Sequence, residues 1–144
     1  MSELENKMLI RRMLAGEVDY LEQWASDAVW TIQGSTRWSG TYSGKADIAR
    51  NLLGPMMAEL KSLGKFEIDN VVAEGDYVVV QGHATGRITQ NGQLYNNTYC
   101  LVYEIVGGKI RQHTEYCDTE LITRAFGPES PFGSSGPNRA GSIL

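Results

Sequence analysis

Apolar residues in the first part of the chain recur at helical spacing. Ser2 and Glu5 fit a capping box, and the apolar positions that follow at i,i+4 spacing predict a helix that ends at Gly16. A second short helix is expected from about Val18 to Trp24, followed by a short strand over residues 28–32. The chain is thus expected to begin with helices and to enter its first strand only after them.

The longest predicted helix follows a loop rich in glycine, serine and threonine over residues 33–43. Ser43 is a good N-cap, and apolar side chains then recur every four residues, which is the pattern of an amphipathic helix. The Gly54-Pro55 pair lies inside this helix. Because proline removes a backbone hydrogen bond, a kink or a break is expected there. Gly64 is expected to cap the end of the helix.

From Lys65 onward the apolar period changes to two, which is typical of strands. Asn91-Gly92 and Gly107-Gly108 are turn signals. Gly82 and Gly86 inside a strand suggest a strongly bent sheet or the close approach of another group. The expected strands run from Lys65 to Gly75-Asp76, over 77–88, over 94–106, and from the last turn to Asp118, before a short helix over 119–126.

Helices gathered on one face of a bent antiparallel sheet predict an α+β fold in a single domain, residues 1–127. A cone-shaped sheet wrapped around the long helix leaves an open mouth, which suits a small hydrophobic ligand. The Gly/Ser/Pro-rich tail, residues 128–144, has few large apolar side chains, so it is expected to add little to the core. Outward apolar residues on strands 77–88 and 94–106 predict a homodimer.

Composition narrows the partners and the compartment. The 144 residues carry a net charge of −4 without a basic patch, so nucleic acid is not expected as a partner. No apolar run approaches the length of a membrane span and no signal-peptide core is visible, so a cytoplasmic protein without membrane contact is expected. Cys100 and Cys117 are expected to be reduced thiols. Because C-x-x-C and H-E-x-x-H motifs are absent, no metal site is expected.

The last predicted strand carries more ionisable groups than a plain core strand. Side chains alternate between the two faces of a strand. One face carries His113, Glu115 and Cys117, and the other carries Gln112, Thr114, Tyr116 and Asp118. A buried carboxylate is costly unless it lines a cavity or finds a partner. The inward carboxylate, Glu115 or Asp118, is therefore the candidate for general acid/base chemistry, with His113 as a further catalytic candidate.

Three motifs carry a resemblance to a known family: YSGK at residues 42–45, N-x-Y at residues 97–99, and GKI…EYCD between Gly108 and Asp118. Together with the order of elements over residues 4–127, they resemble SnoaL-like and ketosteroid-isomerase-related proteins. These belong to the cystatin-like, nuclear-transport-factor-2-like superfamily. The resemblance implies an isomerase, cyclase or hydrolase-type enzyme that needs no cofactor and acts on a small hydrophobic cyclic or polyketide-like substrate. The alternative is a non-catalytic ligand-binding or dimerisation module of the same fold.

The resemblance places the candidate chemistry on Glu115. Ketosteroid isomerases carry a carboxylate base where this chain has Thr31, and a second acid near Tyr99, and neither is present here. Limonene-epoxide-hydrolase-like members use an Asp-Arg-Asp group. Of these three positions, only the second Asp has an acidic counterpart in this chain, Glu115. SnoaL-like cyclases use one carboxylate on the last strand. Glu115 is similar to that carboxylate, with polar neighbours at Asn97, Tyr99 and His113.

The length of the Gly107-Gly108 turn decides which face points inward, because a one-residue slip exchanges the two faces. A two-residue turn pairs Cys100 with Glu115 and turns Asp118 inward. A three-residue loop with a bulge pairs Tyr99 with Glu115 instead, and the resemblance favours it. Asn97 is expected on the cone wall in either case.

The remaining candidates are contacts to the ligand. The expected substrate-binding residues are Asn97, Tyr99, Trp38, Trp30, Thr31, His83 and Met57. Trp38 is placed at the mouth because it lies in the loop before the long helix. A cavity of the order of several hundred cubic ångströms with Glu115 at its floor would support the enzyme. A cone filled by Trp30, Tyr99 and Met57 would support the non-catalytic module.

Overall fold

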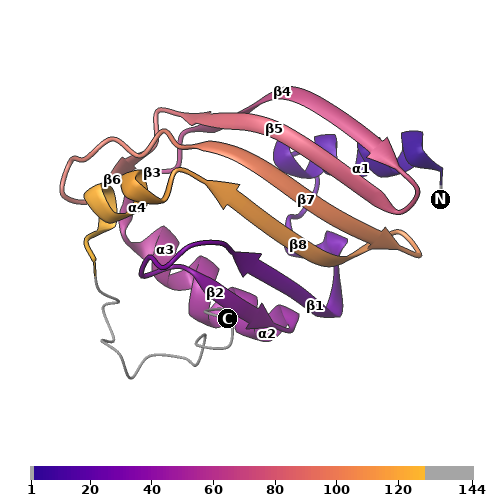
Figure 1. Ribbon diagram of the computed structural model, residues 1–144, viewed down its shortest axis with the longest axis horizontal. Coiled ribbons are helices and arrows are strands. Elements are labelled where there is room, and N and C mark those ends of the chain that lie inside the picture. The colour runs from indigo at the N-terminus through magenta and orange to yellow at the C-terminus, as the bar shows by residue number, and fades with distance from the viewer. Residues whose placement is uncertain (1, 129–144) are drawn as a thin grey trace.

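The computed structural model describes residues 2–128, in which a strongly curved sheet packs against helices (Figure 1). The strands are β1 (Trp24–Ile32), β2 (Gly40–Ser43), β3 (Leu60–Ser62), β4 (Lys65–Glu74), β5 (Tyr77–Thr85), β6 (Ile88–Thr89), β7 (Thr98–Val106) and β8 (Lys109–Cys117). Six of them form one sheet in the order β2-β1-β8-β7-β5-β4, and β3 pairs with β6. All neighbours are antiparallel except β1 and β8, which run parallel. The predicted α+β class is confirmed, with an open mixed sheet.

The helical segments are α1 (Glu3–Leu14), the 3₁₀ turn η1 (Leu21–Gln23), α2 (Lys45–Asp47), the π-helix η2 (Ile48–Leu53), α3 (Gly54–Ala58) and α4 (Thr119–Phe126). The capping box of α1 is confirmed. The Ser2 hydroxyl accepts from the Glu5 N–H at 3.1 Å, and the Glu5 carboxylate accepts from the Ser2 N–H at 2.9 Å. Two of the N–H groups that lack a partner inside the helix are thereby satisfied.

The second helix expected at Val18–Trp24 is wrong. Only the η1 turn forms there, and the Asp19 carboxylate accepts from the Glu22 N–H at 3.1 Å to close it. Trp24 is already the first residue of β1, where it pairs with Ile110 of β8 and is almost fully buried. Pairing with the last strand and burial of the indole override the local helical pattern.

The long helix was predicted in place but not in its bounds. It begins at Lys45 after Gly44, whose positive φ of 96° ends β2, so Ser43 is not the N-cap. It ends at Ala58, because the next residues pair with β6, and Gly64 lies beyond them. At Gly54-Pro55 the expected break is a change from π-helix to α-helix. Pro55 thus falls in the first turn of α3, where its missing N–H costs nothing.

The register of the β7–β8 hairpin differs from both expected registers. Val106 pairs with Lys109, so the turn has two residues, but a bulge beside Glu104 then shifts the pairing by one. Glu115 therefore faces Leu101 rather than Cys100 or Tyr99. The bulge reverses the faces that a plain two-residue turn would give, and Glu115 turns inward while Asp118 does not.

Two strands are also shorter than expected. β5 ends at Thr85, because Gly86 turns the chain at a φ of 68°, and β7 begins only at Thr98. The close approach suggested by Gly82 is confirmed. A Cβ atom at Gly82 would lie only 2.5 Å from the ring of Phe66 on β4.

The convex face of the sheet leaves several large apolar side chains exposed, among them Val72, Tyr77 and Tyr116. The homodimer stays a prediction. No helix within residues 2–128 combines the length and the apolar character needed to cross a membrane. The tail predicted over 128–144 lies, apart from Pro128, outside the described residues.

Candidate functional site

The concave face of the sheet encloses a cavity of about 960 Å³. Its walls come from the α1–β1 connection, from η2 and α3, from the β3–β4 turn, and from inward side chains of β1, β7 and β8. Aliphatic and aromatic groups dominate the lining, and Met57 and Leu63 at its edge are about half exposed. A cavity of this volume is large enough for a drug-sized ring compound.

Glu115 is the carboxylate inside this cavity. Its side chain is 8% exposed, and its backbone carbonyl accepts from the Gln33 N–H at 3.1 Å, which fixes β8 against the end of β1. Burial raises the pKa of Glu115 to about 7, opposed by the positive charge of Arg87 and by hydrogen bonding from the Cys117 thiol. A carboxyl group with this pKa exchanges its proton readily near neutral pH.

His113 lies two residues from Glu115 on the same face of β8, inside a cluster of aromatic rings. Its ring stacks on Tyr103 at 4.2 Å and meets Trp30 edge-on at 4.7 Å. The Nδ1–H donates to the Val102 carbonyl at 3.2 Å, which leaves Nε2 as a lone-pair acceptor. Burial lowers the pKa of His113 to about 3, so the imidazole is neutral at neutral pH. It can orient a group but does not carry charge there.

Uncharged donors line the same cavity as the Glu115 carboxyl group. Burial raises the pKa of the Tyr20, Tyr99 and Tyr103 hydroxyls above their usual range, so all three stay protonated. The Trp30 indole N–H is directed to the Glu115 carboxyl group, where hydrogen bonding lowers the pKa of Glu115 against the effect of burial. Within residues 2–128, the Tyr103 hydroxyl is buried without a hydrogen-bond partner. Buried donors without partners are uncommon in native proteins and are available to an acceptor on a ligand.

Arg87 is a cavity residue that the sequence patterns did not single out. It follows Gly86 in the turn after β5, where its Nε–H donates to the Leu63 carbonyl at 2.8 Å. Its Nη1 lies 3.5 Å from the Tyr99 hydroxyl. No carboxylate among residues 2–128 forms an ion pair with it. The signal that could have marked it is a lone arginine beside a glycine at the end of an apolar strand.

Five of the expected site residues line the cavity: Glu115, His113, Tyr99, Trp30 and Met57. The other five do not. Asp118 is the N-cap of α4, where its carboxylate accepts from the Glu120 and Leu121 N–H groups. Asp118 thus serves α4, and its placement in the cone wall is corrected.

Asn97, Thr31 and His83 also lie outside the cavity lining. The Asn97 side-chain amide donates to the Asp118 carbonyl at 3.0 Å and accepts from the Asp118 N–H at 3.1 Å, so it ties β8 to the start of β7. The Thr31 hydroxyl lies 3.3 Å from that of Thr41 on β2, and His83 pairs with Asp69 on the convex face. Asn97 and Thr31 thus join strands, and none of these three side chains lines the cavity.

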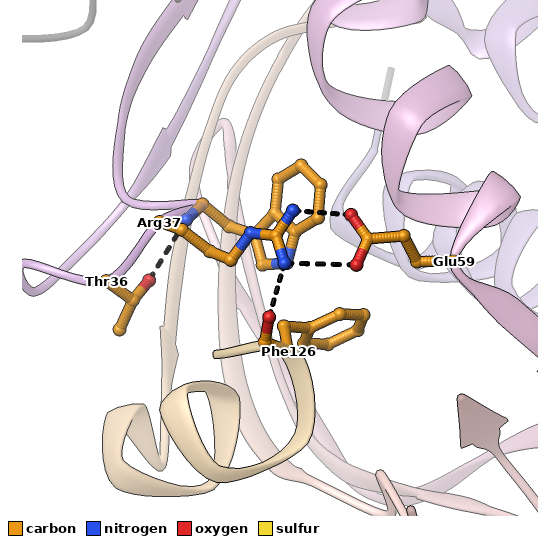
Figure 2. A network of polar contacts seen from close by, with 5 residues as sticks. Thr36, Arg37, Glu59 and Phe126 are labelled. Atoms are coloured by element: carbon orange, nitrogen blue, oxygen red, sulfur yellow. Dashed lines mark hydrogen bonds and ion pairs between the residues drawn. The ribbon is translucent and has the colours of Figure 1, made fainter. Parts of the chain in front are cut away.

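Trp38 is not at the mouth. It is 2% exposed and packs edge-on against Phe126 at 5.6 Å. The Arg37 guanidinium lies over its ring, 4.8 Å from the centroid. Figure 2 shows that Arg37 also forms a two-fold pair with Glu59, at 3.0 and 2.5 Å, and donates to the Phe126 carbonyl. This cluster joins the β1–β2 loop, the end of α3 and α4.

Residues 2–128 contain no group of three or more His, Cys, Asp or Glu side chains placed to hold a metal ion.

The structure belongs to the class of α+β folds in which an open, curved sheet and the helices packed against it enclose a cavity, here with a carboxyl group inside. A family model of the SnoaL-like domain matches residues 10–113, and the chain belongs to this family. No curated protein matches the chain.

Solved structures show the same fold. A nuclear-transport-factor-2-like protein of unknown function from Burkholderia pseudomallei is 19% identical, with a TM-score of 0.74 over 87% of this chain and 98% of that chain. A proposed isomerase from Bacillus subtilis is 22% identical, with a TM-score of 0.73 over 90% and 99%. A proposed SnoaL-like polyketide cyclase from a Jannaschia species is 16% identical, with a TM-score of 0.70 over 87% and 93%. These likenesses show that the chain shares its fold with these proteins.

Proposed function

We propose that this SnoaL-like protein is an enzyme of the isomerase or cyclase type that moves a proton on a small, largely apolar cyclic substrate. The observation that carries the proposal is Glu115, a carboxyl group that is buried in a ligand-sized cavity. The pKa of this carboxyl group lies near 7. Acid/base catalysts work best when their pKa lies close to the working pH. This chemistry requires only the carboxyl group, so no cofactor is invoked.

The proposed step begins with ionised Glu115. Its carboxylate removes a proton from a carbon next to a substrate carbonyl, and the electron pair of that C–H bond moves onto the carbonyl oxygen to give an enolate. The protonated Glu115 then returns the proton to another position of the same ring system. The unpartnered Tyr103 hydroxyl is the donor available to the enolate oxygen.

The cavity also bears on the non-catalytic alternative. Trp30, Tyr99 and Met57 line the cavity but do not fill it, since about 960 Å³ remains. A module that served only for dimerisation would gain stability by filling this space, because empty volume costs packing energy. The retained volume and the buried carboxyl group therefore support a ligand site with proton-transfer chemistry.

The test follows deuterium exchange into cyclic ketones and 1,3-diketones in heavy water by NMR. Glu115→Gln keeps the shape and removes the ionisation, and it should lower protein-catalysed exchange by about 10²–10⁴. The matched control is Asp118→Asn, which changes the nearby carboxylate outside the cavity and keeps a good N-cap residue. The proposal is wrong if Glu115→Gln exchanges as fast as the wild type, or if Asp118→Asn loses as much.

A further inference from the structure

We propose that Arg87 is the anchor for one anionic oxygen group on the ligand, so that the cavity selects ring compounds carrying a single negative charge. The inference rests on the cavity being the ligand site proposed above. It adds the charge of the ligand and the residue that reads it.

The Arg87 side chain is held in place before any ligand binds. Its backbone N–H donates to the Asn96 side-chain oxygen at 2.9 Å, and its carbonyl accepts from the Tyr95 N–H at 2.8 Å. The Nε–H donates to the Leu63 carbonyl at 2.8 Å, which fixes the plane of the guanidinium. A group ordered in advance loses little entropy when it binds a partner.

Most of the hydrogen-bonding capacity of this guanidinium is unused. An arginine carries five N–H donors. Leu63 takes the one on Nε, and the Tyr99 hydroxyl lies at a long 3.5 Å from Nη1. Over residues 2–128, the remaining donors of Arg87 have no protein acceptor and no carboxylate within ion-pairing distance. A two-pronged donor of this kind matches carboxylate-like oxygen groups.

The surroundings make Arg87 different from the other cation at the cavity. Lys65 also lines the cavity, but it is exposed to solvent at the rim. Arg87 is half-buried and lies beside the aromatic wall formed by Tyr99 and Phe66, whose rings are 5.8 Å apart. A ligand whose ring packs on this wall brings its substituents close to the guanidinium.

Arg87 also acts electrostatically on Glu115. Its charge lowers the pKa of Glu115 against the larger effect of burial, and it has the same effect on Tyr99 and Tyr20. The other charged side chains that line the cavity are Asp19, Lys65 and Glu67, at its exposed rim. An anion on Arg87 offsets the charge that favours the Glu115 carboxylate. Anion binding should therefore raise the pKa of Glu115 and take up protons near pH 7.

The experiment uses two fluorescent probes that differ by one charge. Anilinonaphthalene sulfonate is an anion, and N-phenylnaphthylamine is its uncharged parent. Arg87→Met should weaken binding of the sulfonate by about 10- to 100-fold, the size of a charge-assisted hydrogen-bonded contact, and change binding of the uncharged probe less than about two-fold. Lys65→Met removes the same charge at the rim and should change sulfonate binding less than about three-fold.

Arg87→Lys keeps the positive charge but lacks the paired donors of the guanidinium. Its affinity for the sulfonate should fall between those of the wild type and Arg87→Met. If Arg87→Met fails to fold, this variant alone decides, with the uncharged probe reporting an intact cavity. Calorimetry in two buffers of different ionisation heat should show proton uptake on sulfonate binding near pH 7, and Glu115→Gln should abolish it.

Three outcomes separate the two proposals. If neither probe enters the wild-type cavity, the proposed ligand site fails and this inference fails with it. If the uncharged probe binds but Arg87→Met leaves the sulfonate affinity unchanged, only the anchoring role of Arg87 is overturned. Equal losses in Arg87→Met and Lys65→Met would show a general effect of net charge and would also overturn it.

Discussion

Two arginine–glutamate sets in this molecule have opposite arrangements. Arg37 and Glu59 form an ion pair, and Nη1 of Arg37 also donates to the Phe126 carbonyl (Figure 2). The guanidinium lies over the Trp38 ring, while its Nε–H is buried without a partner. Arg87 and Glu115 both line the cavity, yet they form no ion pair. Arg37 and Glu59, whose charges neutralise each other, are here the closed set. Arg87 and Glu115, which line the cavity without pairing with each other, are the open set.

The difference separates groups that hold the fold from groups that are available to a ligand. A buried ion pair with further hydrogen bonds offsets its own desolvation and fixes the elements that it joins. Unpaired groups in a cavity cost stability, and a protein retains such groups most often at functional sites. The arrangement of these two sets, rather than their residue types, indicates where chemistry takes place.

The largest expected effect comes from breaking the closed set. Glu59→Gln leaves the Arg37 charge, 6% exposed, without its carboxylate, and should lower the free energy of unfolding by about 3–5 kcal/mol. Arg37→Met should cost less, because the Glu59 side chain is about one-third exposed and can turn to water. Urea denaturation measures both values.

The double variant Arg37→Met/Glu59→Met is the control, since replacing both partners by apolar groups removes the stranded charge. It should recover most of the loss in Glu59→Gln. Binding of N-phenylnaphthylamine should stay unchanged in all three variants. A loss of probe binding with intact stability would show that the closed set also shapes the cavity.

The next effect is the pH dependence of stability that the buried groups of the cavity produce. The pKa of Glu115 is raised from 4.5 to about 7, so its contribution to stability falls as pH rises across that interval. The pKa of His113 is lowered from 6.5 to about 3, so its contribution rises with pH across its own interval. The two slopes, each about 1.4 kcal/mol per pH unit, oppose each other between pH 4.5 and 6.5.

Single variants should therefore reveal slopes that the wild type conceals. Between pH 4.5 and 6.5, stability should rise with pH in Glu115→Gln and fall with pH in His113→Asn, while the wild type changes little. At pH 8, Glu115→Gln should be more stable than the wild type by about 3 kcal/mol. Parallel pH profiles for all three proteins would contradict the buried, unpaired state of these groups.

The smallest effect tests the part of the cavity wall that Phe66 forms near Arg87. A Cβ atom at Gly82 would lie 2.5 Å from the Phe66 ring and 2.6 Å from the Glu67 carbonyl oxygen. Gly82→Ala should therefore cost about 1–3 kcal/mol and move Phe66 in the cavity wall, which changes the affinity for N-phenylnaphthylamine. Gly75→Asn, at a positive φ with open space, should cost less than about 1 kcal/mol and leave probe binding unchanged.

The sequence predicted the face that Glu115 occupies better than it predicted its partners. Alternation along the last strand, together with the family resemblance, put His113 and Glu115 inward. The bulge beside Glu104 shifts the pairing by one residue, and no residue pattern in GGKIRQ marks it. The predicted wall therefore contains the right carboxylate opposite Leu101, a neighbour that neither expected register assigned to it.

The missed cavity residues share a different cause. Arg87 and Tyr20 lie outside the regular strands and helices, in connections whose path depends on contacts distant in sequence. Arg87 faces the cavity because Gly86 turns the chain and the Leu63 carbonyl receives its Nε–H. Periodicity describes strands and helices, so it carries no information on the direction of such side chains.

The parallel pairing of β1 with β8 links the cavity to the order in which the chain folds. Trp30, near the beginning of the chain, is the partner of His113, near its end, so this contact closes a very long loop. Contacts of that kind form late, because the entropy of loop closure is lost before the pairing compensates for it. During synthesis, Trp24 and Trp30 have no β8 to pack against until the last strand emerges. The cavity is therefore completed only when β8 joins β1.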